Sequence, residues 1–319
     1  MIAAVFRGPN EVGIEEVERP SAGEGEIIVR VGANTICGTD VRILKGEKTK
    51  GVVVPGVLGH ELSGRVVEVG AGVSGREVGE TVVVAPQVPC GRCRACRRDL
   101  ENLCPNIRIL GYDIPGGLSE YVRVPREAVR AGCVFAADAR VPFEQLALAE
   151  PLACCINGHE KSGTKMGDNV VILGAGPIGL FHLQLSMLAG AENVIVSEPS
   201  EERRKAALLF GATRAVSPDK LTANVEELTG GEGADVSVVC IGIPSLVNDA
   251  IRLTRPAGRV NVFAGLSGAG WAEVEANQIH YKELVLTGTS NSRRRDFEKA
   301  IRLIEAGRVD VGRMVTHRY

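Results

Sequence analysis

Four closely spaced cysteines suit a metal ion. Cys90, Cys93, Cys96 and Cys104 follow the pattern C-x2-C-x2-C-x7-C. Four thiolates can surround one zinc ion tetrahedrally and leave no open position for a substrate, so this spacing predicts a structural zinc site. The alternatives are a disulfide pair, chance clustering, and an iron–sulfur cluster, although the spacing differs from the common ferredoxin patterns.

A second set of metal-ligand types is dispersed along the chain. Cys37 lies in a Cys-Gly-Thr-Asp run, and His60 and Glu61 follow Gly59. One thiolate, one imidazole and one carboxylate are typical of catalytic zinc, which keeps a coordination position open. A single histidine or cysteine is more often structural, but His60 is one of only five histidines and lies in a glycine-flanked turn. The pattern therefore indicates a second, catalytic zinc site.

A glycine-rich turn in the second half of the chain predicts a dinucleotide site. Residues 174–179 read Gly174, Ala175, Gly176, Pro177, Ile178, Gly179, which is G-x-G-x-x-G. The turn follows an apolar run and opens a predicted helix, the context in which this motif binds a pyrophosphate. The first glycine makes the turn, the second lets the backbone approach the phosphates, and the third lets helix and strand pack closely. The helix N-terminus adds free N–H groups.

Glu198 stands at the expected distance after this motif and favours NAD over NADP. Its carboxylate can accept hydrogen bonds from the ribose 2′-hydroxyl, and it would repel a 2′-phosphate. Arg203, which we include among the candidate coenzyme-binding residues, and Arg204 lie close by. An arginine can accommodate a phosphate, so NADP stays open as an alternative.

The elements that must position these residues fall into two groups. Residues 1 to about 130 read as short β-branched strands punctuated by glycine and proline, which predicts a closed or partly open barrel. Beyond residue 142, apolar strands alternate with helices, which predicts a doubly wound parallel sheet. The expected helices are 143–162, 178–189, 201–210, 245–253 and 295–305, and the expected strands here are 169–173, 193–197, 234–240, 258–263 and 284–288.

Length and composition exclude several classes of protein. A chain of 319 residues predicts two domains. The 45% hydrophobic and 24% charged content is that of a globular protein, and no run approaches a membrane span. The N-terminus shows no signal-type pattern, so we expect a cytoplasmic protein. The formal net charge of −2 argues against nucleic acid as a partner, although the arginines around the four cysteines leave a zinc-ribbon binder as a weak alternative.

Taken in order, these motifs resemble the zinc-containing medium-chain dehydrogenase/reductase family over essentially the whole chain. The run Glu150-Pro151-Leu152 is similar to its polyol (sorbitol or L-iditol 2-dehydrogenase) and threonine dehydrogenase branches. The resemblance implies a GroES-like β-barrel catalytic domain, residues 1–150 and 291–319, and a Rossmann NAD-binding domain, residues 151–290. It also implies two zinc ions per chain, NAD, and a homodimer or homotetramer. Such oligomers often join Rossmann sheets edge to edge, here through 257–263 or 284–288.

The resemblance also implies roles for individual residues. Cys37, His60 and Glu61 would bind the catalytic zinc, and Glu150 would be a fourth ligand or a nearby acid. Asp40 would accept the other ring N–H of His60. Thr39 would pass a proton from the substrate hydroxyl toward the nicotinamide ribose. The implied reaction moves a hydride from a secondary alcohol, of polyol type, to NAD and yields the ketone.

This sequence departs from the family pattern at three places. Arg42 stands where many members have a relay histidine, and an arginine keeps its protons. Ile43 stands where sorbitol dehydrogenases often place a tyrosine. Members usually continue for some tens of residues past the position of Tyr319, adding a helix and a strand of the catalytic domain, so either this sequence is truncated or the chain is unusually short. L-threonine or another secondary alcohol is the alternative substrate, and a catalytically silent NAD-binding homologue is the alternative function.

Overall fold

The computed structural model describes residues 1–268 and 270–319, which form two compact units. The first, called the β unit below, comprises Met1–Ala153, Asn291–Gly307 and Val311–Tyr319. The second, called the Rossmann unit, comprises Cys154–Ser290 and Arg308–Asp310. The sequence analysis placed domain boundaries at residues 150 and 291. Because compact units need not fold independently, these domain boundaries stay a prediction.

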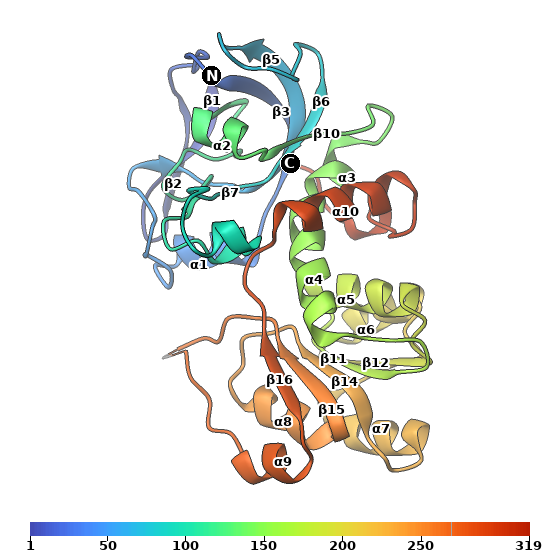
Figure 1. Cartoon of the computed structure of the whole chain (residues 1–319). Coiled ribbons are helices and arrows are strands. Elements are labelled where there is room, and N and C mark those ends of the chain that lie inside the picture. Colours follow the sequence, from blue (N-terminus) through green and yellow to red (C-terminus); the bar gives the residue numbers. More distant parts are fainter. Residues whose placement is uncertain (269) are drawn as a thin grey trace. The chain divides into compact units, whose positions relative to one another are not determined.

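The β unit is built on two antiparallel sheets (Figure 1). The larger sheet has the order β10-β6-β5-β3-β9, and the smaller has the order β2-β1-β4. The β-rich N-terminal half is therefore confirmed, with its strands paired as two sheets. The strands are β1 (Ile2–Gly8), β2 (Glu11–Glu16), β3 (Ile27–Thr35), β4 (Gly56–Val57), β5 (Glu61–Val69), β6 (Thr81–Val84), β9 (Tyr121–Val124) and β10 (Val134–Ala136).

Short elements fill the space between these strands. The helices of the β unit are α1 (Gly38–Leu44), α2 (Arg126–Arg130), α3 (Phe143–Ala147) and α10 (Arg294–Glu305), and the hairpin β7 (Gln87–Val88) and β8 (Arg108–Ile109) brackets the four-cysteine segment. That segment contains two single 3-10 turns, Cys96–Arg98 and Glu101–Leu103, and a further one spans Gly312–Met314. Among the described residues, no helix combines the length and apolar character needed to cross a membrane.

The Rossmann unit is a six-stranded parallel sheet of order β13-β12-β11-β14-β15-β16. The order reverses beside β11, which confirms the doubly wound sheet. Its strands are β11 (Asn169–Leu173), β12 (Asn193–Ser197), β13 (Arg214–Val216), β14 (Ala234–Val239), β15 (Thr254–Val262) and β16 (Val285–Gly288). Its helices are α4 (Ala149–Ser162, which begins in the β unit), α5 (Pro177–Leu188), α6 (Glu201–Leu209), α7 (Leu221–Thr229), α8 (Ser245–Leu253) and α9 (Ala276–Tyr281), with a 3-10 turn at Pro218–Lys220.

The apolar run of β11 is buried on both faces, as a central parallel strand requires. Val171 and Leu173 belong to the core cluster that α7 and α8 complete. Ile172 points the other way, toward Gly179 of α5. Figure 1 shows α5 and α6 on the side of the sheet opposite α7 and α8. Continuous burial therefore explains why this strand shows no polar alternation.

Three predicted details were wrong. The single helix expected over 143–162 is two helices, because Pro151 lacks the N–H that would continue the ladder to Ala147 and is tolerated only in the first turn of α4. The sequence analysis missed β13, α7 and α9. In α7 the apolar residues Leu221, Val225 and Leu228 recur at helical spacing and pack in the core, so this helix could have been predicted. Residues 257–263 cannot form a free sheet edge, because β15 lies between β14 and β16, whereas β16 has one neighbour.

The close packing of α5 on β11 gives a test with an internal control. A Cβ on Gly179 would lie 1.9 Å from the carbonyl oxygen of Gly174, while a Cβ on Gly176 would meet no atom within 4 Å. We expect Gly179→Ala to lower the free energy of unfolding by about 1–3 kcal/mol or more, and Gly176→Ala to leave it almost unchanged. Thermal and denaturant unfolding measure both. Equal stability of the two variants would contradict the packing.

Candidate active site and metal centres

The structure brings Cys37, His60 and Glu61 together. The Sγ of Cys37 and one ligand atom each from His60 and Glu61 all lie within 4.8 Å of one another. Cys37 immediately precedes α1, and His60 and Glu61 lie where the chain enters β5. His60 and Glu61 are only 5% and 4% exposed. Residues far apart in the sequence thus form one buried site.

Asp40 lies beside His60. Its Oδ1 lies 3.2 Å from His60 Nδ1, while its Oδ2 accepts a hydrogen bond of 2.9 Å from the main-chain N–H of Cys37. The same carboxylate therefore ties the start of α1 to the imidazole. This leaves Nε2 as the histidine atom for a metal, which is the usual carboxylate–histidine arrangement at metal sites.

Burial disfavours the charged form of each of the three ligand side chains and so shifts their pKa values. It raises the pKa of the Cys37 thiol. Burial, together with the neighbouring carboxylate of Glu150, raises the pKa of Glu61 to about 7, although Thr35 donates a hydrogen bond to Glu61. For His60, burial acts to lower the pKa, but the neighbouring Asp40 carboxylate and Cys37 outweigh it and hold that pKa well above its usual range.

A divalent cation would relieve this cost. Thiolate, imidazole and carboxylate in a buried tripod match the donor set of catalytic zinc, which takes three protein ligands and keeps a fourth position for water or substrate. Crowded acidic groups also gain most from a positive ion at their centre. The residues present therefore fit zinc, and they fit the open site predicted from the sequence.

Glu150 lies near this tripod but outside its group of ligand atoms. It is buried in the first turn of α4, and its Oε1 accepts a hydrogen bond of 3.0 Å from Gln87 Nε2. Its carboxylate acts electrostatically on both Glu61 and His60. Its role as a ligand therefore stays a prediction, while its place beside the ligands is a structural fact.

Tyr112 is a site residue that the sequence analysis missed. Its ring lies edge-on to the ring of His60, with 5.4 Å between centroids, and Thr39 lies close enough to its hydroxyl to influence the ionisation of that group. Burial raises the pKa of Tyr112 to about 12, which keeps the hydroxyl protonated. Ile43, in contrast, is 1% exposed and packs with Phe6 and Leu58 in the core. Its side chain thus belongs to the support of the site.

In the sequence, the glycines at 111 and 116 indicate that the loop carrying Tyr112 packs closely against another segment. A Cβ on Gly116 would lie 2.2 Å from the carbonyl oxygen of Gly59, and one on Gly111 would lie 2.6 Å from the same atom. The loop that carries Tyr112 can therefore approach the backbone before His60 only because these positions lack side chains.

The four cysteines form the second predicted cluster. Ligand atoms of Cys90, Cys93, Cys96 and Cys104 lie within 4.8 Å of one another, and the Sγ atoms of Cys93 and Cys96 are 3.4 Å apart. Main-chain N–H groups of Arg92 and Cys93 point to Cys90 and lower its thiol pKa to about 6. The pKa of Cys93 is lowered as well, whereas burial raises the pKa of Cys96 to about 12 and also raises that of Cys104. Four sulfurs gathered in one cluster fit a closed tetrahedral zinc site. All nine cysteines are free of disulfide bonds.

The glycine-rich turn forms as predicted, and Glu198 packs against it. Gly176 caps α5, Pro177 occupies its first turn, and Ile178 and Gly179 follow within that turn. Glu198 Oε2 accepts a hydrogen bond of 3.0 Å from the N–H of Ala175, and Oε1 accepts one of 3.1 Å from the N–H of Ser200. Gly174 has a φ of +108°, as the tight turn requires.

Arg204, and not Arg203, has its guanidinium at the strand end that carries Glu198. Its Nη1 donates to the carbonyl oxygens of Glu198 and Pro199 at 2.8 and 2.6 Å. The side chain of Arg203 is exposed. Its main-chain N–H donates a hydrogen bond of 3.4 Å to Oγ of Ser200, the N-cap residue of α6. The predicted coenzyme contact of Arg203 therefore stays a prediction.

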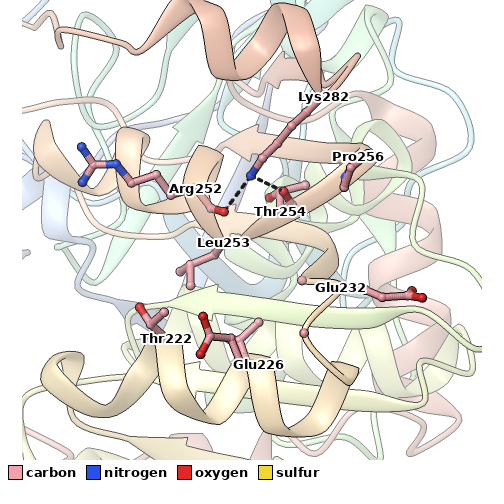
Figure 2. A pocket seen from close by; sticks show the side chains of 11 residues that line it. Thr222, Glu226, Glu232, Arg252, Leu253, Thr254, Pro256 and Lys282 are labelled. Atoms are coloured by element: carbon pink, nitrogen blue, oxygen red, sulfur yellow. Dashed lines mark hydrogen bonds between the residues drawn. The ribbon is translucent and has the colours of Figure 1, made fainter.

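A cavity of about 240 Å³ in the Rossmann unit is not part of these sites (Figure 2). It lies at the amino ends of β14 and β15, whereas coenzymes bind at the carboxyl ends of such strands. The Nζ of Lys282 donates to the carbonyl oxygens of Arg252 and Thr254 at 2.8 and 3.0 Å. That lysine thus satisfies carbonyl groups at the end of α8.

Two family models match the chain. The model of the zinc-binding dehydrogenase family matches residues 177–306, and the model of the alcohol dehydrogenase GroES-like domain matches residues 23–133. The first match covers the end of the glycine-rich turn, from Pro177 on, and most of the Rossmann unit. The second covers both metal-ligand clusters. Together they confirm the resemblance on which the sequence-based expectations rest.

Individual relatives match over nearly the whole chain. The L-threonine 3-dehydrogenase of Pyrococcus furiosus is 34% identical, over 100% of this chain and 91% of its own length. Two solved structures are similar. A zinc-binding dehydrogenase from Sinorhizobium meliloti bound to NADP has a TM-score of 0.90 and 34% identity, over 98% of this chain and 90% of that one. The 2R,3R-butanediol dehydrogenase of Bacillus subtilis has a TM-score of 0.86 and 32% identity, over 96% and 88%.

Metal analysis separates the two clusters. We expect about two zinc ions per purified chain, and about one in Cys93→Ser, because loss of one thiolate opens the four-cysteine site. Cys154→Ser is the matched control, since Cys154 is half-buried and belongs to neither cluster. Elemental analysis after dialysis measures the ratio. Two zinc ions retained in Cys93→Ser would contradict the assignment.

Proposed function

The chain belongs to the zinc-binding alcohol dehydrogenase family, and from that premise we propose that it oxidises the secondary alcohol of a small hydroxy acid of L-threonine type. As a member, it is a zinc-dependent, NAD(P)-linked oxidoreductase that acts on a CH–OH group. The observation that carries the assignment is the buried tripod of Cys37, His60 and Glu61, with Asp40 behind the histidine.

The substrate class rests on the relatives, which favour the threonine alternative over the polyol substrate expected first. An L-threonine 3-dehydrogenase matches the full chain at 34% identity. The buried position of Ile43 removes it from the substrate side, so its difference from polyol enzymes has no bearing there. A diol is the second candidate, because the butanediol dehydrogenase structure is similar over 96% of the chain.

The chemistry that zinc and NAD(P) supply when bound determines what the residues of the site must do. When bound, zinc lowers the pKa of a coordinated hydroxyl, and NAD(P) accepts the hydride released from the alcohol carbon. Cys37, His60 and Glu61 hold the metal, and Asp40 orients His60. Thr39 would hydrogen-bond to the substrate hydroxyl and pass its proton on toward the nicotinamide ribose, while Tyr112, whose raised pKa keeps its hydroxyl protonated, takes up no proton. Arg42 stays charged throughout and takes no proton.

Localisation and assembly stay predictions, namely a cytoplasmic homodimer or homotetramer. The exposed edge strand β16 offers unpaired backbone groups, so a second copy of the chain could extend the sheet there.

The direct experiment follows reduced nicotinamide by absorbance. The zinc-loaded chain is incubated with NAD and with L-threonine, butane-2,3-diol, sorbitol, xylitol, galactitol, inositols and simple secondary alcohols. We expect turnover of L-threonine or a related hydroxy acid. Turnover of polyols alone would contradict the proposed substrate, and a blank panel with zinc and NAD bound would favour a silent homologue.

We also propose that Glu150 would exchange with Glu61 as a ligand of a bound zinc ion during turnover, because the two carboxylates are neighbours at the site. Glu150→Gln keeps the hydrogen-bonding shape toward Gln87 but removes the charge that acts on Glu61 and His60. We expect slower turnover and weaker zinc binding, measured by steady-state kinetics and by competition with a chelator. Full turnover with unchanged zinc affinity would contradict the exchange.

Coenzyme preference tests the role of Glu198. Its carboxylate is held beside the glycine-rich turn, where it would repel a 2′-phosphate. We expect Glu198→Ser to raise kcat/KM with NADP relative to NAD, and Glu198→Gln, which keeps the size of the side chain, to shift the ratio in the same direction. Unchanged discrimination in both variants would remove Glu198 from this role.

A further inference from the structure

We propose that the substrate carries an anionic group, a carboxylate or a phosphate, and that Lys48, assisted by Arg42, holds this group beside the zinc ligands. The inference rests on the proposed function and narrows its substrate class. It gives a purpose to two cations that the mechanism leaves unused.

Lys48 reaches the metal tripod through one aromatic ring. Its Nζ lies 4.8 Å from the centre of the Tyr112 ring, and the centre of that ring lies 5.4 Å from the centre of the His60 ring. Tyr112 also contacts Thr39, the residue proposed to receive the substrate proton. A cation in this place lies no more than about 10 Å from the centre of the His60 ring, which sets an upper limit on the length of a substrate that joins the two.

The loop after α1 places Lys48 there. The N–H groups of Glu47 and Lys48 both donate to the carbonyl oxygen of Arg42, at 2.9 and 3.2 Å, so the chain folds back over the end of the helix. The Nζ of Lys48 donates to the carbonyl oxygen of Lys50 at 2.9 Å. The backbone thus holds the ammonium group close to the Arg42 side chain, which acts on it electrostatically.

The two cations have little compensating charge. Arg42 has one carboxylate near it, that of Glu47, at 3.8 Å, and Glu47 is exposed. In the part of the chain that the structure describes, no carboxylate lies within 4.0 Å of Lys48 Nζ. Two cations held close together repel each other, and an anion that binds between them offsets this repulsion, so the pair favours anion binding.

The tripod itself makes these cations necessary for an acidic substrate. Asp40, Glu61 and Glu150 place three carboxylates around the metal position, in addition to the Cys37 thiolate. Two of these four negative charges would balance the charge of a zinc ion. The other two would repel an alcohol that carries a negative charge of its own. Lys48 and Arg42 supply the opposing field on the side of Tyr112. A neutral alcohol gains nothing from them.

The experiment compares alcohols that differ only in the charged group. Parent and Lys48→Met are assayed with 3-hydroxybutyrate against butan-2-ol, and with galactitol 1-phosphate against galactitol. We expect Lys48→Met to raise KM for a turned-over anionic alcohol by about tenfold with kcat little changed, and to leave KM for its neutral counterpart as it was. Lys48→Arg should restore most of the affinity.

Controls separate this role from a structural one and from the coenzyme. Lys50→Met is the matched control, because Lys50 contacts Lys48 through its main-chain carbonyl and its side-chain charge acts on Lys48 less than that of Arg42 does. An equal rise in KM for charged and neutral alcohols would overturn the proposal. A change in the KM of NAD alone would also overturn it, because the cations would then bind a coenzyme phosphate. Turnover of neutral alcohols only would overturn it while the dehydrogenase assignment stands, whereas no turnover of any alcohol would count against both.

Discussion

The structure depends on burying a thiol, an imidazole and three carboxyl groups in one place. Asp40, His60, Glu61 and Glu150 are each at most 5% exposed, and Cys37 lies against them. Such a concentration of ionisable groups is unfavourable unless the groups pair with one another or surround a cation. The Asp40–His60 pair meets part of this requirement. Cys37 and Glu61 lie outside that pair, and together with His60 they form the donor set of a catalytic zinc site. One bound zinc ion would therefore both compensate the buried charges and supply the chemistry.

The surrounding fold places these groups by backbone contacts that need glycine. The Tyr112 loop lies against Gly59 because Gly111 and Gly116 have no side chains, and the turn of the Rossmann unit closes because Gly174 adopts a positive φ. Both sites thus stand at irregular backbone held by regular strands: His60 precedes β5, and the glycine-rich turn follows β11. Rigid strands with chemistry at their ends are what catalysis by positioning requires.

The sequence predicted those parts of the molecule that local patterns determine. The apolar strand before the glycine-rich turn, the four-cysteine spacing and the Cys37, His60 and Glu61 set were all readable, because each depends on residue types within a short span or on a known order of motifs. Tyr112 and Lys48 were not, since their contacts with His60 and with each other come from a loop that crosses back in space. Pro151 divided a predicted helix for a local reason that could have been applied. The placement of Glu150 beside the tripod, with its oxygen turned to Gln87, required coordinates.

The most direct test of the central claim is the response of the metal to the substrate. Cobalt can replace zinc at the Cys37, His60 and Glu61 site, and its visible absorption bands change when its ligands change. With cobalt at this site and native zinc in the four-cysteine lobe, adding a turned-over secondary alcohol should shift the cobalt bands, because the tripod leaves a position open. If the alcohol is oxidised while the bands stay unchanged, the reaction does not occur at this metal and the account is wrong.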